Sequence, residues 1–125
     1  MGTVRNPLFK NTFFTLAALL IFVASASGHA VLLESSPALK DTVAGPDVPI
    51  KLRFNVRIDA SRSRLTLVRP DGSTHPLEIS KQSPADSLLA NATGLPPGTY
   101  ILRWQVLASD GHITRGEISF SVTRA

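Results

Sequence analysis

Short runs in which apolar residues alternate with other residues, separated by turn residues, constrain the fold of this chain most strongly. In "VPIKLRFNV", the apolar residues Ile50, Leu52, Phe54 and Val56 recur at every second position. This spacing places one set of side chains on a single face of a β-strand, and no segment after residue 28 keeps the 3.6-residue period of an amphipathic helix. The pattern therefore predicts an all-β domain.

Further runs of the same kind continue to the end of the chain. "RLTLV" is followed by the turn sequence "RPDGST", after which "HPLEIS" returns. "LPPGTYILRWQVLASDGH" begins with a Pro-Pro-Gly turn, and "GEISFSV" places Ile118, Phe120 and Val122 on one inward face. Turns at such short intervals predict a Greek-key β-sandwich of about seven strands.

Two aromatic residues in the penultimate run bear on the core. Tyr100 follows a Pro-Gly turn at the start of a strand. This position fits either a tyrosine corner, in which the hydroxyl binds back to the preceding loop, or a plain buried aromatic residue. We predict that Trp104, which stands in mid-strand among inward-facing residues, belongs to the core.

The N-terminal segment has the organisation of a secretory signal peptide. Arg5 and Lys10 precede the apolar run 13–24, and small residues follow it at once. A membrane-spanning helix needs about 20 apolar residues, and the run 13–24 is shorter than that. A retained membrane anchor is therefore the weaker alternative. We therefore expect residues 1–28 to be a signal peptide and residues 29–125 to be the mature domain.

Small residues allow two cleavage positions. Cleavage after Ala26 leaves Ser27 as the first residue, whereas cleavage after Gly28 leaves His29. Both positions have small residues at the first and third places before the cut, and this pattern alone prefers neither strongly.

The composition of residues 29–125 argues against nucleic-acid binding and limits which atoms could bind a metal. These 97 residues are enough for one domain, and they carry 11 Lys and Arg against 9 Asp and Glu, which argues against a nucleic-acid-binding protein. The chain has no cysteine, and its single methionine is Met1. Because the mature chain then lacks the soft sulfur ligands that Cu(I) favours, any metal site must consist of nitrogen and oxygen donors.

The sequence "SDGH" contains two candidate metal ligands, Asp110 and His112. In an extended segment their side chains leave the same face, with Cα atoms about 6.6 Å apart. The alternative is a turn, because Asp-Gly is a strong turn dipeptide. In contrast, His75 has no acidic or histidine partner at ligand spacing, so we expect it to be exposed and uninvolved.

His29 would complete a metal site if it were the mature terminus. Its α-amine and its imidazole Nδ1 can chelate one ion from a single residue. Together with a nitrogen of His112 and an oxygen of Asp110, they give three nitrogen donors and one oxygen donor, a tetragonal set that Cu(II) favours. The first strand must then lie beside the turn before the last strand, which a β-sandwich permits.

The blocks "HAVLLESSPA" and "LPPGTYILRWQVLASDGHITRGEISFSV" resemble the CopC-type periplasmic copper-resistance proteins. The resemblance covers essentially the whole mature chain. It implies an immunoglobulin-like β-sandwich with one Cu(II) bound by the mature N-terminal histidine, here His29, and by Asp110 and His112. Some relatives carry a second, methionine-rich Cu(I) site, which this chain cannot form because it has no mature methionine.

The resemblance also bears on cleavage and on function. Cleavage after Ala26 would create a terminal Ser27-Gly28-His29 chelate, but only cleavage after Gly28 gives Asp110 and His112 a shared role. We expect a monomeric, periplasmic copper-homeostasis protein without enzymatic activity, which passes its ion to an inner-membrane copper transporter and does not insert stably into the membrane. The alternatives are a histidine-brace copper monooxygenase and an immunoglobulin-like module without metal.

Overall fold

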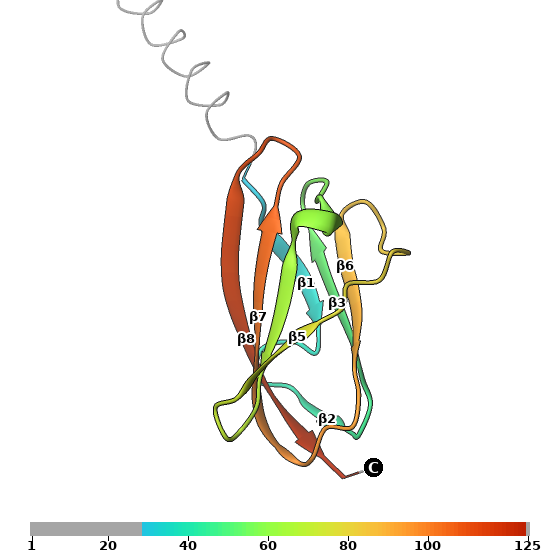
Figure 1. Cartoon of the computed structure of the whole chain (residues 1–125), viewed down its shortest axis with the longest axis vertical. Coiled ribbons are helices and arrows are strands. Elements are labelled where there is room, and N and C mark those ends of the chain that lie inside the picture. The colour runs from blue at the N-terminus through green and yellow to red at the C-terminus, as the bar shows by residue number, and fades with distance from the viewer. Residues whose placement is uncertain (1–28, 125) are drawn as a thin grey trace, which may run out of the picture.

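The computed structural model describes residues 29–124, so the predicted signal peptide lies outside the described residues. These residues form eight strands and one short 3-10 helix (Figure 1). In chain order the elements are β1 Leu32–Ser36, β2 Thr42–Ala44, β3 Val48–Phe54, η1 Ala60–Arg62, β4 Arg64–Val68, β5 Thr74–Leu77, β6 Ser87–Ala92, β7 Gly98–Leu107 and β8 Ile113–Thr123.

The strands form a sandwich of two sheets, which confirms the predicted all-β fold. One sheet has the order β1-β3-β6 and the other has the order β2-β8-β7-β4-β5. β2 was not expected. It has three residues, too few to show alternation, and it pairs in parallel with the end of β8, where Val43 lies opposite Val122.

The core lies between the two sheets and consists of the alternate residues that the sequence indicates. On β3 the buried residues are Val48, Ile50, Leu52 and Phe54, whereas Val56 lies beyond the end of the strand and is only half-buried. The opposite sheet contributes the buried residues Tyr100, Leu102, Trp104, Val106, Ile118, Phe120 and Val122. Each large apolar side chain buried in this way contributes about 1.5–3 kcal/mol, and in a chain without cysteine this packing holds the sandwich together.

Tyr100 forms a tyrosine corner, the first of the two alternatives that the sequence left open. Its side chain is buried and stacks on Phe120, with 5.8 Å between the ring centroids. Its hydroxyl donates a hydrogen bond of 2.6 Å to the carbonyl oxygen of Pro96, in the turn just before β7. The corner therefore ties the loop between β6 and β7 to the core.

Removal of this hydroxyl should destabilise the fold without changing its shape. We expect Tyr100→Phe to lower the free energy of unfolding by about 1 kcal/mol, because the Pro96 carbonyl loses its donor while the ring stays packed. Urea denaturation of the two proteins measures the difference. Equal stabilities would mean that the hydrogen bond contributes nothing beyond the packing of the ring.

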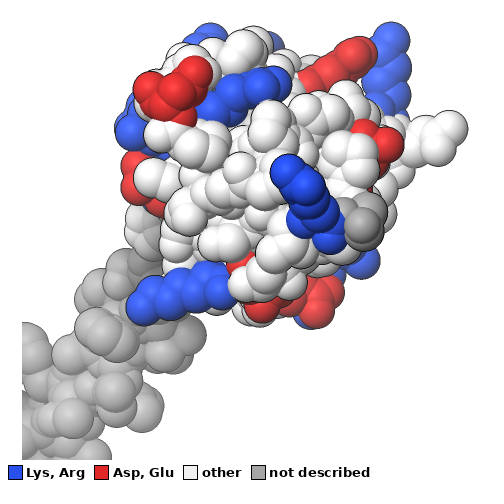
Figure 2. Space-filling model, turned by 90° about the horizontal axis from the view of Figure 1, so that it is seen from below, with Lys and Arg blue, Asp and Glu red and all other residues white. Residues whose placement is uncertain are grey.

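The two ends of the sandwich differ. The β7–β8 connection and the chain before β1 lie at one end, and the C-terminus lies at the other (Figure 1). Seen from the C-terminal end, positive and negative side chains are interspersed around a largely uncharged centre (Figure 2). Residues 29–124 contain no helix with the length and hydrophobicity needed to cross a membrane.

Candidate metal centre

The "SDGH" segment forms a tight turn between β7 and β8. Oδ1 of Asp110 accepts a hydrogen bond of 3.0 Å from the backbone N–H of His112, and Gly111 has a φ of +91°, which favours glycine. The backbone N–H of Ala108 donates to the carbonyl oxygen of His112 at 2.9 Å and closes the turn. The extended geometry considered for Asp110 and His112 is therefore wrong, because local turn formation by Asp-Gly prevails.

The turn nevertheless brings the two side chains together. The His112 Nδ1 and the Asp110 Oδ2 lie 2.9 Å apart, and the His112 side chain is 65% exposed. Two hydrogen bonds hold the pKa of the Asp110 carboxyl below its ordinary value. The larger effect comes from the His112 ring and the smaller from the His112 backbone N–H. The carboxyl therefore stays ionised at neutral pH and presents a negative charge beside an accessible imidazole.

His29 meets this pair from the other end of the chain. Its side chain is exposed, and its ring centroid lies 5.3 Å from that of His112, with 49° between the ring planes. The first strand thus lies beside the turn before the last strand, as the sequence hypothesis requires. The structure brings His29, Asp110 and His112 to one end of the sandwich.

Asn55 positions the chain next to His29. Its side-chain Oδ1 accepts a hydrogen bond of 2.7 Å from the backbone N–H of Val31, and its own backbone N–H donates to the Val31 carbonyl at 3.1 Å. Ala30, between His29 and Val31, is only 4% exposed. These contacts fix the course of the chain immediately after His29, a role for Asn55 that sequence reasoning missed.

Loss of the Asn55 side chain should therefore affect His29 without removing a candidate ligand. We expect Asn55→Ala in the protein that begins at His29 to weaken Cu(II) binding by up to about fivefold, since a side-chain hydrogen bond is worth about 1 kcal/mol. A competition titration against a chromophoric chelator measures this. Unchanged affinity would show that the buried Ala30 positions His29 by itself.

No set of three or more His, Asp or Glu side chains in residues 29–124 is already arranged to hold a metal ion. Both oxygens of Asp110 are engaged by His112, and in the uncleaved chain the backbone nitrogen of His29 is an amide rather than an amine. A complete donor set would need the proton between Asp110 and His112 to leave and the peptide bond before His29 to be cut.

His75 lies apart from these residues. It is exposed on β5, opposite Leu67 of β4, and its Nε2 lies 3.5 Å from the Ser73 hydroxyl. The predicted exposure of His75 is confirmed.

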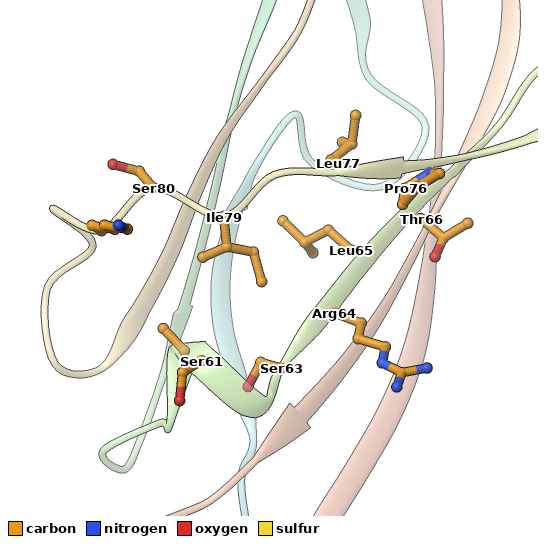
Figure 3. A pocket seen from close by; sticks show the side chains of 11 residues that line it. Ser61, Ser63, Arg64, Leu65, Thr66, Pro76, Leu77, Ile79 and Ser80 are labelled. Atoms are coloured by element: carbon orange, nitrogen blue, oxygen red, sulfur yellow. The ribbon is translucent and has the colours of Figure 1, made fainter.

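One cleft of the domain is separate from the candidate ligands. It has a volume of about 770 Å³ and lies along β4, β5 and η1, where Leu65, Leu77 and Ile79 form an apolar floor (Figure 3). Neither His29, Asp110 nor His112 lines it. The side chains of His29 and His112 are instead exposed on the surface of the domain.

Comparison with known protein families identifies the family of this chain. The CopC domain family matches residues 32–123, which contain all eight strands. The chain belongs to the CopC family. This confirms the family resemblance drawn from the two terminal sequence blocks.

Similar proteins and one solved structure agree with this assignment. "Copper resistance protein C" of Xanthomonas campestris pv. juglandis is 36% identical over 107 residues, which cover 79% of this chain and 84% of that protein. The crystal structure of CopC from Methylosinus trichosporium OB3b superposes with a TM-score of 0.69 at 30% identity, covering 77% of this chain and 95% of that one. "Copper transport protein CutJ" of Bacillus subtilis is 25% identical over 110 residues, which cover 85% of this chain but only 20% of that longer protein.

Proposed function

We propose that the mature protein is a periplasmic copper-resistance protein that binds one Cu(II) through His29, Asp110 and His112. The observation that carries this proposal is the meeting of His29 and His112, whose ring centroids lie 5.3 Å apart although the residues come from opposite ends of the domain. Membership of the CopC family supports copper as the metal.

The donor set favours the oxidised ion. Removal of residues 1–28 converts the backbone nitrogen of His29 into an α-amine, which chelates together with the imidazole of the same residue. His112 adds a nitrogen and Asp110 an oxygen, so the set has three nitrogen donors and one oxygen donor. Such a set suits the tetragonal coordination of Cu(II), whereas the mature chain contains no sulfur ligand for Cu(I).

The bond between Asp110 and His112 is compatible with direct ligation by both residues. Two donors in adjacent positions on an ion, each about 2.0–2.1 Å away, lie about 2.9 Å apart. The His112 Nδ1 and the Asp110 Oδ2 are already separated by 2.9 Å. The ion can therefore replace the proton that they share, and the carboxylate partly neutralises its charge.

Cleavage after Gly28 is part of this proposal. Cleavage after Ala26 would give a different chelate, built from the Ser27 amine, two amide nitrogens and the His29 imidazole, and it would leave Asp110 and His112 without a role. The proximity of the His29 and His112 rings supports cleavage after Gly28.

We infer a carrier rather than an enzyme. Asp110 would fill the coordination position that an oxygen-activating copper site keeps open for its substrate. The similarity to part of CutJ, whose name describes copper transport, supports an inner-membrane copper transporter as the partner that receives the ion.

The experiment that tests this function is a Cu(II) titration of protein that begins at His29. We expect one equivalent to bind, and Asp110→Asn to weaken binding about threefold to tenfold, because the amide keeps the shape but cannot neutralise the ion. Circular dichroism should show an unchanged fold in the variant. Unfolding of the metal-free variant would instead mean that Asp110 serves only the turn.

His75→Ala provides the matched control in the same titration. The variant removes an exposed imidazole that lies outside the candidate centre, so its Cu(II) affinity should equal that of the parent. A loss of Cu(II) affinity of about tenfold or more would show that the proposal names the wrong histidines as ligands.

A further inference from the structure

The outer face of the five-stranded sheet carries three arginines on neighbouring strands. Arg64 of β4 lies opposite Gln105 of β7, which in turn lies opposite Arg115 of β8, so the three form one row across the sheet. Arg103 is two residues from Gln105 on β7 and belongs to the next row. Since alternate residues of a strand share a face, all three arginines project from the same side.

The side chains of this face are arranged by their own contacts. The Arg115 Nε donates to Gln105 Oε1 at 2.8 Å, and the Arg103 Nε donates to Glu117 Oε1 at 3.0 Å. Arg64 lies at the border between the cleft of β4 and β5 (Figure 3) and the outer hollow, and it lines both. Within residues 29–124 no hydrogen bond engages the terminal nitrogens of these guanidinium groups, so their bidentate donor edges are available to a ligand.

The excess positive charge of the domain is concentrated here. The three arginines and Glu117 give this face two surplus positive charges, whereas the rest of residues 29–125 has eight Lys and Arg and eight Asp and Glu. The C-terminal end, in contrast, shows mixed signs (Figure 2). The arginines line a shallow hollow of about 390 Å³ together with Thr66, Gln105 and Glu117.

We propose that this arginine face, defined by Arg64, Arg103 and Arg115, docks an acidic segment of a partner protein. The two rows are two residues apart along β7, about 6.6–6.8 Å, and an extended peptide presents alternate side chains at the same interval. Carboxylates at every second position of such a segment therefore match both rows. The planar, oriented guanidinium groups favour discrete carboxylates over a diffuse anionic surface. The proposal does not depend on the copper site.

The test uses metal-free protein beginning at His29 and a blocked hexaglutamate peptide, with blocked hexaglutamine as the neutral control. Isothermal titration calorimetry measures binding, because the only tryptophan, Trp104, is buried on the opposite, core-facing side of the sheet. We expect hexaglutamate to bind in a salt-sensitive manner and hexaglutamine not to bind. Replacement of Arg64, Arg103 and Arg115 together by Gln should weaken binding about tenfold or more.

Two further variants make the test specific. Glu117→Gln should tighten peptide binding about twofold or more, because it removes the only negative charge of the face and releases Arg103. Arg124→Gln, which removes an equal charge near the C-terminus, should bind the peptide as the parent does. Circular dichroism checks the fold, and an unchanged Cu(II) affinity of the triple variant separates this face from the proposed copper site.

Three results would overturn the proposal. They are equal binding of hexaglutamate by the triple variant and the parent, equal binding of hexaglutamine and hexaglutamate, and adsorption to phosphatidylglycerol vesicles without any binding of the peptide. The last result would assign the face to a membrane surface instead of a protein partner.

Discussion

Protein that carries one extra methionine before His29 should fold normally but bind Cu(II) at least about tenfold more weakly than protein that begins at His29, a cost of about 1.4 kcal/mol or more. The extra residue turns the His29 amine into an amide and moves the new amine one residue away from the chelate. Every candidate ligand side chain is still present. The fold should survive, because Ala30 is buried and β1 begins only at Leu32. Competition titrations of the two proteins against one chelator measure the ratio.

His112→Ala, made in protein that begins at His29, is the companion to this experiment. It removes a nitrogen donor from the other side of the site, so it should also weaken Cu(II) binding. In this variant the extra methionine should reduce the Cu(II) affinity less than it does in the parent, because the donor set is already incomplete. Equal affinities of the methionine-extended and the native-terminus proteins would contradict the amine chelate and leave His29 as a plain imidazole ligand or none.

Gly116→Val should lower the free energy of unfolding by about 2–3 kcal/mol. Gly116 lies opposite Trp104 on the inner face of the sheet, and a Cβ at this position would come within 2.8 Å of the indole Nε1 and closer still to the ring carbons. The rigid indole must then move, and it loses its edge-on contact with Phe54, where the ring centroids are 5.3 Å apart. Urea denaturation followed by circular dichroism measures the loss.

The control for Gly116→Val is Ser119→Val on the same strand. Ser119 lies opposite Ile101 and is only half-buried, so the added methyl groups meet no packed ring. Its stability should stay within about 0.5 kcal/mol of the parent. Similar losses in both variants would attribute the effect to β8 in general rather than to the contact between Gly116 and Trp104.

Patterns with a two-residue period predicted the sheets and most of the core. The alternation from Ile50 to Phe54 and the inward position of Trp104 are both confirmed, because burial on one face of a strand leaves a direct record in the sequence. β2 shows no such alternating pattern in the sequence. Its three residues become a strand only through pairing with the end of β8, which is distant in the chain.

The candidate site could be predicted in composition but not in local geometry. His29, Asp110 and His112 have the chemistry of metal ligands, and the resemblance to the CopC family pointed to these residues. The turn at Asp110 follows from backbone hydrogen bonds that compete with the extended conformation. Asn55 went unnoticed because its contact with Val31 joins residues 24 positions apart, and the arginine face emerges only once the register of β4, β7 and β8 is known.

The mass of the intact protein, recovered from the bacterial periplasm and measured under non-denaturing conditions with and without copper, tests the central claim most directly. It reads the mature terminus and the number of bound ions together. The account predicts a chain that begins at His29 and gains the mass of one copper ion per chain when copper is supplied. A chain that begins at Ser27, a chain that keeps residues 1–28, or a His29 chain that gains no copper would contradict it.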